Sequence, residues 1–141
     1  MRILGLMSGS SLDGVDIAEL EFGQAGTLDW HLKSCHSYEM PEGLTHRLRQ
    51  ALELKAPALA ELQHDYTDFL VSCISRFTDE YRPLAKYISL HGHTLLHRRE
   101  IAFSWQMVNA GYLSVKSGLH VLTDFRNQDM AAGGIGTPMA A

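Results

Sequence analysis

The first part of the chain alternates hydrophobic and polar residues and predicts three β-strands in succession. Residues 2–7 (RILGLM) are mostly apolar, residues 15–22 alternate with a single slip, and residues 28–38 begin with a regular alternation. Successive side chains of a strand point to opposite faces, so this period is typical of strands with one buried face. The glycines within residues 23–27 favour a turn. We therefore expect an antiparallel meander at the start of the fold.

Beyond residue 40 the spacing of the apolar residues changes to that of helices. Pro41 begins a short helical pattern, and Pro57 begins a long one whose apolar stripe ends before Pro83. The stripe follows the i, i+3, i+4 spacing of a helix that packs on a core, and proline is well tolerated in a first turn. A third, short helix is expected between Asn109, as its N-cap, and Gly118 at its C-terminal end.

Short apolar stretches after the long helix predict the remaining strands. Residues 86–90 and 119–125 are expected to be strands, and residues 101–106 a strand or an extended stretch. Residues 89–100 and 123–138 are expected to be loops, the second because of its polar residues and glycines. The element order predicts an α/β fold with a mixed five-stranded sheet, in which the later strands run parallel to the first. This is the ribonuclease H-like layout, which also builds each lobe of the actin-like ATPases.

Composition narrows the class of protein. The 141 residues are 45% hydrophobic and 20% charged, which fits one globular domain. The formal net charge of -4 argues against a nucleic-acid partner, which prefers a basic face. No apolar run approaches the ~20 residues of a membrane-spanning helix, and the apolar N-terminal stretch is too short for a secretory signal, so we expect a cytoplasmic protein without a membrane partner.

Two further features concern the cysteines and the C-terminal stretch. Cys35 and Cys73 are widely spaced and predict no disulfide framework, and Cys73 lies on the apolar helical stripe, where a buried free thiol is expected. The chain ends in MAAGGIGTPMAA, on small and apolar residues without a completed element. We interpret this ending as a shortened chain or as one lobe of a larger protein.

The stretch MSGSSLDGVD, residues 7–16, places a polar loop directly after the first strand. Gly9 and Gly14 allow several backbone N–H groups to face one concavity, and such a nest binds phosphate oxygens. Asp13 could hold a hydrated magnesium ion beside a phosphate. The lysine and spacing of a P-loop are absent. An ordinary polar turn is the alternative interpretation.

The segment SLHGHTLLHRRE, residues 89–100, follows a predicted parallel strand. Ligands of open α/β sheets collect at the carboxyl ends of such strands. His91, His93 and His97 could contact a ligand, could bind a metal such as zinc, or could be solvated loop residues. Polar contact with a ligand is the interpretation that the position favours.

The segment TDFRNQDMAAGGIGTP, residues 123–138, contains Asp124, Arg126 and Asp129 ahead of three closely spaced glycines. A carboxylate within reach of a hydroxyl or a water can take its proton, and glycines let the backbone approach a ligand. For Asp124 we expect a structural ion pair with Arg126. For Asp129, beside the glycines, we favour acid/base chemistry.

The three segments together resemble the signatures of the anhydro-N-acetylmuramic acid kinases in order and spacing. The family pattern reads MSGTSLDG(V/I)D, then SHGQT, then DFRxxDxAxGGxGAPL, and it spans nearly the whole chain. The resemblance implies an actin-like ATPase fold of two lobes. It also implies a reaction in which ATP and Mg²⁺ serve to phosphorylate 1,6-anhydro-N-acetylmuramic acid while water opens its anhydro ring. The product would be N-acetylmuramic acid 6-phosphate, an intermediate of peptidoglycan recycling.

The same resemblance suggests roles for individual residues. Asp13 would be the carboxylate on the metal side, Asp16 would order the loop, and Asp129 would be the general base that activates the water. The sugar-binding wall would comprise His91, Gly92, His93, Thr94 and Arg126. The loop that meets the ATP phosphates would comprise Gly9, Ser10, Ser11, Leu12, Asp13, Gly14, Val15 and Asp16.

The chain departs from the family pattern in sequence and in length. Ser10 replaces threonine, Thr137 replaces alanine, and His93 stands where the family commonly has glutamine, which puts a substrate contact there in doubt. The family's chain is more than twice as long, and its second lobe supplies the adenosine pocket. We therefore expect this N-terminal lobe alone to bind ATP weakly, to catalyse poorly and to self-associate through the bared cleft.

Two other classes of protein remain as alternatives. A metal-dependent nuclease could use Asp13, Asp124 and Asp129 to hold two magnesium ions on the same fold. A non-catalytic binding or regulatory module could keep the fold after losing turnover.

Overall fold

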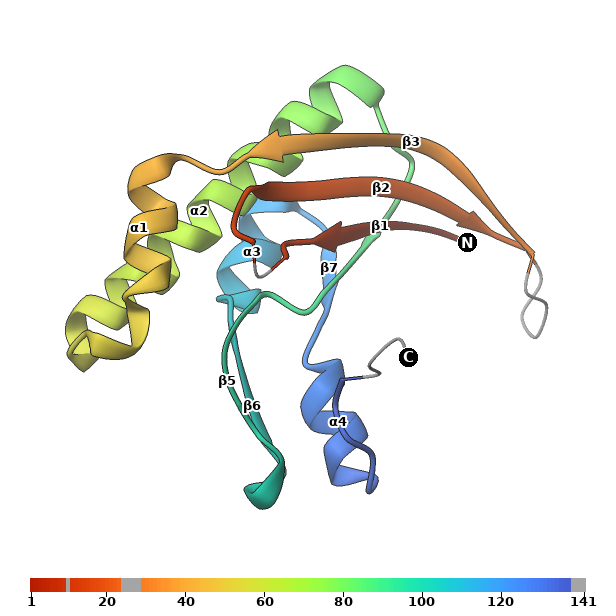
Figure 1. The fold of residues 1–141 in the computed structure, drawn as a ribbon. Coiled ribbons are helices and arrows are strands. Elements are labelled where there is room, and N and C mark those ends of the chain that lie inside the picture. The colour runs from red at the N-terminus through yellow and green to blue at the C-terminus, as the bar shows by residue number, and fades with distance from the viewer. Residues whose placement is uncertain (10, 24–28, 138–141) are drawn as a thin grey trace.

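A computed structural model describes residues 1–9, 11–23 and 29–137. Its centre is a mixed five-stranded sheet with strand order β3-β2-β1-β4-β7. An antiparallel meander forms one side, from β1 (Arg2–Met7), β2 (Gly14–Phe22) and β3 (Trp30–Glu39), whereas β4 (Tyr87–Leu90) and β7 (His120–Leu122) run parallel to β1 (Figure 1). The predicted α/β fold and its strand directions are confirmed, and β7 is shorter than predicted.

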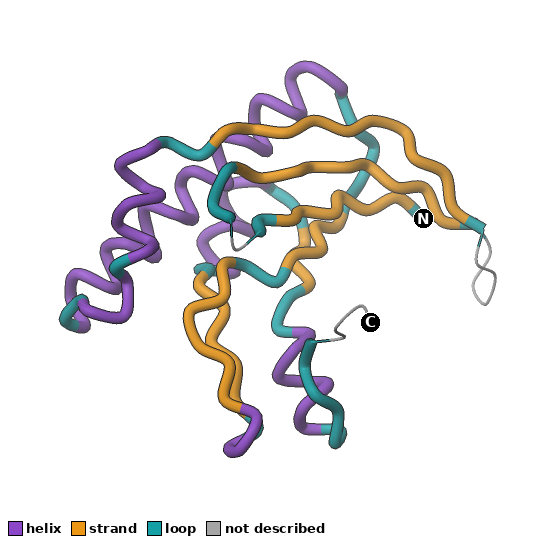
Figure 2. Tube along the Cα trace, in the orientation of Figure 1, coloured by secondary structure: helices purple, strands orange, loops and turns teal. Residues whose placement is uncertain are grey.

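Three of the α-helices lie together beside the sheet: α1 (Glu42–Arg49), α2 (Ala56–Tyr81) and α3 (Ala110–Ser117). A short 3-10 turn (Ala51–Glu53) joins the first two. Contacts run from α2 to β2 and β3, and from α3 to β7 and α2. The helices therefore gather beside the sheet as one layer, as Figure 2 shows. The helix α4 (Phe125–Ala131) lies apart from them, next to a hairpin described below.

The long helix α2 forms because its apolar residues recur at helical spacing and all face the sheet. Pro57 lies in its first turn, as predicted, and Arg82 ends it in a left-handed conformation. Most of the largest fully buried side chains of the core come from this helix and from the central strands; they include Leu62, Tyr66, Leu70, Phe77, Leu4, Ile17 and Ile88. Cys73 on the same stripe is buried and free, which confirms the prediction for this thiol.

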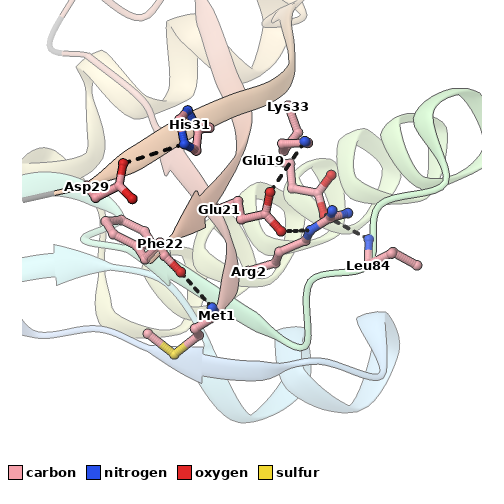
Figure 3. A network of polar contacts seen from close by, with 9 residues as sticks. All are labelled: Met1, Arg2, Glu19, Glu21, Phe22, Asp29, His31, Lys33 and Leu84. Atoms are coloured by element: carbon pink, nitrogen blue, oxygen red, sulfur yellow. Dashed lines mark hydrogen bonds and ion pairs between the residues drawn. The ribbon is translucent and has the colours of Figure 1, made fainter. Parts of the chain in front are cut away.

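Charged residues fix the register at the N-terminal end of β1, far from the site described below. The Arg2 Nε atom donates to Glu21 at 3.0 Å, and Lys33 pairs with the same carboxylate at 3.3 Å (Figure 3). The buried Glu19 accepts from the backbone N–H of Leu84 at 2.8 Å. Because a slip of one residue would turn these side chains to the other face, the network holds β1, β2 and β3 in one register.

The structure corrects two predicted loops. Residues 89–100 include β5 (His93–Arg98), which pairs with β6 (Phe103–Met107) in a separate antiparallel hairpin. A register shift between Thr94 and Leu96 breaks the alternation that would have indicated this strand. Residues 125–131 form α4, a helix too short to show a helical stripe in the sequence. Within the described residues, no helix is long and apolar enough to cross a membrane.

Candidate active site

Two adjoining hollows lie at the carboxyl end of β1, where ligands of open α/β sheets collect. Met7, the last residue of β1, and Gly9 line both. The acidic hollow, of about 430 Å³, is further lined by Ser11, Asp13, Gly14, Asp16, Ser37, Tyr38 and Glu39. The histidine hollow, of about 360 Å³, is further lined by Ser8, His91, His93, Thr94 and Arg126. A larger hollow of about 590 Å³ at the β7 edge includes none of the predicted site residues.

The loop between β1 and β2 is anchored to the core and to the start of α1. Leu12 adopts a left-handed conformation with φ 58°, and its side chain is buried in the core. Its carbonyl accepts from the Thr45 hydroxyl of α1 at 3.1 Å, and the carbonyl of Asp13 accepts from the backbone N–H of Met40 at 3.0 Å. Ser10 lies outside the described residues. This anchoring keeps the polar side chains of the loop at the mouth of the acidic hollow.

Asp13 and Asp16 both line the acidic hollow. The Ser11 hydroxyl donates to Asp13 Oδ1 at 2.7 Å and is the main cause that lowers the pKa of this exposed carboxyl. Asp13 is therefore ionised at neutral pH. Asp16, expected to order the loop, accepts from the Ser37 hydroxyl at 2.5 Å, a bond that joins β2 to β3. One or two carboxylates that face open space fit a magnesium ion that keeps most of its waters.

Two other residues of the predicted phosphate loop point inward. The side chains of Leu12 and Val15 are buried, so only their backbone could contact a ligand. Gly14 has no room for a β-carbon because the carbonyl of Tyr38 lies against it, which explains glycine at this position.

The histidine hollow brings together the second and third predicted segments. The His91 Nε2 atom lies 3.3 Å from the Met7 sulfur. Burial is the main cause that lowers the pKa of His91, and the nearby positive charge of Arg126 is the second. Burial is also the main cause of the lowered pKa of His93, with His91 as the second cause. Thr94 donates to Gln106 on β6 at 2.8 Å. His91, His93, Thr94 and Arg126 thus line one hollow, whereas Gly92 is not among its lining residues, and the sugar-binding role of these residues stays a prediction.

The buried histidines make stability depend on pH. Because the folded state lowers the pKa of both His91 and His93 from 6.5, their contribution is complete above that value and is lost as the pH falls below it. We expect the free energy of unfolding, measured with urea, to fall between pH 7 and pH 5. In the variant His93→Gln the free energy of unfolding should fall less between pH 7 and pH 5. An unchanged fall would show that His93 does not contribute to this pH dependence.

Arg126 reaches the hollow because Asn127 fixes α4 to the hairpin. The Asn127 side chain accepts from the backbone N–H of Ser104 at 2.7 Å and donates to the carbonyl of the same residue at 2.8 Å. It also donates to Asp124 at 2.6 Å. The ion pair expected between Asp124 and Arg126 is wrong, since among the described side chains Asp124 bonds Asn127 while Arg126 turns to the hollow.

Asp129 organises the glycine-rich turn after α4 and lines neither hollow. Its Oδ2 atom accepts from the backbone N–H of Gly136 at 2.7 Å, and its carbonyl accepts from the N–H of Gly134 at 2.8 Å. The Asp129 carboxylate occupies the space that a β-carbon at Gly134 would need, so a larger residue at position 134 would displace this carboxylate. The carboxylate therefore has a visible structural use besides any chemical one.

A multi-ligand metal site is not formed by the described part of the chain. No group of three His, Cys, Asp or Glu residues there could hold a metal ion. His97 instead lies 3.3 Å from the Ser104 hydroxyl and 3.4 Å from that of Thr137. The three-histidine metal site and the three-aspartate nuclease site are both wrong for these residues.

Several polar residues of the site carried no local signal in the sequence. Ser37, Gln106 and Asn127 act through partners on other elements. Asn127 could have been found only by recognising the hairpin whose backbone it binds.

Comparison with known proteins gives the class and then the family. The relatives that match are kinases, and the sequence pattern of the family described as anhydro-N-acetylmuramic acid kinase matches residues 1–141. The chain belongs to the anhydro-N-acetylmuramic acid kinase family.

Individual relatives show how much of the family's length is present. The enzyme of that name from Haemophilus influenzae is 35% identical over 96% of this chain, and that from Acidithiobacillus ferrooxidans is 38% identical over 99%. The matched region is 37% and 35% of the two relatives, so the chain spans a little over a third of their length. Among solved structures, a Thermus thermophilus RuvC structure matches all of this chain and 73% of its own, with a TM-score of 0.48 and 12% identity.

Proposed function

We propose that residues 1–141 form the N-terminal lobe of a cytoplasmic kinase that phosphorylates 1,6-anhydro-N-acetylmuramic acid at the expense of ATP and opens its anhydro ring with water. The product is N-acetylmuramic acid 6-phosphate. The observation that carries this proposal is the meeting of two hollows of different chemistry at Met7 and Gly9. A phosphate donor and a sugar acceptor must lie side by side for transfer, and the two hollows adjoin in this way.

The acidic hollow is the proposed ATP side. Gly9 and Gly14 line it without side chains that would block the loop backbone, and Asp13 is ionised and open to solvent. ATP bound with Mg²⁺ supplies the transferable phosphoryl group. Asp13 would hold the hydrated ion, Ser11 keeps that carboxylate oriented and charged, and the buried Leu12 keeps the loop from collapsing into the hollow.

The histidine hollow is the proposed sugar side. Uncharged His91 and His93 offer ring nitrogens to sugar hydroxyls, and Arg126 offers a positive charge to the carboxylate of the lactyl group. The general base is assigned to Asp129, on the family motif and not on its surroundings. Its Oδ2 atom is engaged with Gly136, so a proton from water would go to Oδ1. A variant of Asp129 therefore tests whether this residue is the general base.

The N-terminal lobe alone is proposed to phosphorylate the sugar slowly, because phosphoryl transfer needs groups on both sides of the nucleotide. The remaining lobe of the family, or self-association of this one, would cover the cleft. A non-catalytic binding module on the same fold is the alternative.

The test is an intact mass of the polypeptide from its native source, followed by an assay with anhydro-N-acetylmuramic acid, ATP and Mg²⁺. We expect a chain of more than twice 15.7 kDa that forms a product heavier by one phosphoryl group and one water. The isolated 141 residues should be far slower. A long native chain without turnover overturns the proposal, and a native chain of 15.7 kDa that binds the sugar without turnover supports the binding module.

A further inference from the structure

Three buried polar atoms around the histidine hollow have no hydrogen-bond partner among the described residues. They are the Ser8 hydroxyl, the Tyr66 hydroxyl and the His91 Nδ1 atom. The Ser8 side chain is 8% exposed, and Tyr66 is fully buried. Native proteins pair the great majority of their buried polar groups, so a cluster of unpaired groups indicates a missing partner at this place.

The three groups come from three elements and converge from different sides. Ser8 follows β1 and lines the hollow, and His91 follows β4 and lines it too. Tyr66 lies in the middle of α2 and does not line the hollow. Its hydroxyl is nevertheless close enough to Ser8 for the Ser8 hydroxyl to affect the pKa of Tyr66. The Tyr66 ring is held by the core and by the His93 ring, 6.3 Å away between centroids. Tyr66 therefore stands behind Ser8 as seen from the hollow.

The chemistry of the cluster fits an uncharged polar group of a ligand. A serine hydroxyl both donates and accepts, and a neutral imidazole nitrogen does one or the other. Burial raises the pKa of Tyr66 to about 12, so at neutral pH it is a phenol that can donate to Ser8. Burial keeps His91 neutral as well. The three groups are uncharged and match a sugar hydroxyl, whereas the positive charge of Arg126 in the same hollow is assigned to the carboxylate of the lactyl group.

We infer that Ser8 and His91 hydrogen-bond a hydroxyl group of the sugar in the histidine hollow, and that Tyr66 is a positioning residue that orients the Ser8 hydroxyl toward it. This inference rests on the proposed function, because it assigns the sugar to this hollow. It adds two residues to the predicted site. Ser8 would contact the substrate, and Tyr66 would act only through Ser8.

The test is a double-mutant cycle on the full native polypeptide with Ser8→Ala, Tyr66→Phe and the double variant. Removal of one hydrogen bond is expected to raise the KM for the sugar about 3- to 10-fold in each single variant, with the KM for ATP unchanged. Because Tyr66 acts through Ser8, the double variant should be no worse than Ser8→Ala alone. Tyr66→Phe removes only a buried hydroxyl whose partner would be Ser8, so Tm should change little.

Tyr81→Phe is the matched control, since Tyr81 ends the same helix and its hydroxyl lies 3.2 Å from His36, away from both hollows. It should leave the KM for the sugar unchanged. A wild-type KM in Tyr66→Phe, or additive effects in the double variant, would overturn the inference while the kinase remains. Absence of phosphorylation in the wild-type polypeptide would instead overturn the proposed function and the inference with it.

Discussion

Replacing Asp129 with asparagine is expected to lower kcat about 100-fold or more in the native polypeptide, since a general base contributes that much to proton transfer. Asparagine keeps an acceptor oxygen for the Gly136 N–H but cannot take a proton. The turn at residues 133–137 should therefore stay in place while the water is no longer activated. The measurement is steady-state turnover with anhydro-N-acetylmuramic acid, with hydrogen exchange of the Gly136 amide as the record of the turn.

The alanine variant separates the two uses of this carboxylate. Asp129→Ala removes both the base and the acceptor, so it should lose turnover and also expose the Gly136 amide to exchange. If Asp129→Asn turns over like the wild type while Asp129→Ala does not, the carboxylate serves only to hold the turn, and the base must be sought elsewhere.

Replacing Gly92 with alanine is expected to cost about 3 kcal/mol or more of the free energy of unfolding. Gly92 has φ +77°, which alone costs an L-residue about 1–2 kcal/mol. A β-carbon would also lie 2.6 Å from the backbone oxygen of Met107, which is part of the buried core and cannot easily move. The hairpin would be pushed away from the end of β4. Urea unfolding at constant m-value measures the loss.

Gly43 provides the matched control in the same chain. It lies in the helix α1, and a β-carbon there meets nothing within 4 Å. Gly43→Ala should leave stability unchanged or raise it by up to about 1 kcal/mol, because alanine is the better helix former. Equal urea midpoints for Gly92→Ala and Gly43→Ala would show that the backbone at Gly92 accommodates a β-carbon without loss of stability.

The sheet could be predicted because each strand carries its own signal. Alternation in residues 15–22 and the proline-bounded stripe up to Tyr81 are local patterns, and their order leaves few topologies open. The second strand of the hairpin, β6, overlaps the predicted stretch 101–106, whereas its first strand, β5, was missed because the shift between Thr94 and Leu96 interrupts its alternation. Its strands are also stabilised by pairing with each other and by Asn127, neither of which is visible in a short window of sequence.

The grouping of the predicted site residues could be foreseen where they lie in motifs, whereas their roles stay predictions. Gly9 and Asp13 lie in the loop after β1 and His91 follows β4, so the carboxyl ends of these parallel strands place them in two adjoining hollows. The expected ion pair of Asp124 and Arg126 is wrong because side chains two positions apart at the start of a helix do not face each other, and Asn127 donates to the Asp124 carboxylate. Tyr66 looked like a core residue in the sequence, and only the unpaired hydroxyl distinguishes it.

The clasp between Asn127 and the backbone of Ser104 links residues 23 positions apart in the chain. It makes the placement of Arg126 depend on a strand that precedes it, rather than on β7, to which α4 is directly joined. If the histidine hollow binds the sugar as proposed, a random mutagenesis screen for sugar binding should return substitutions along β6 at positions that do not contact the sugar.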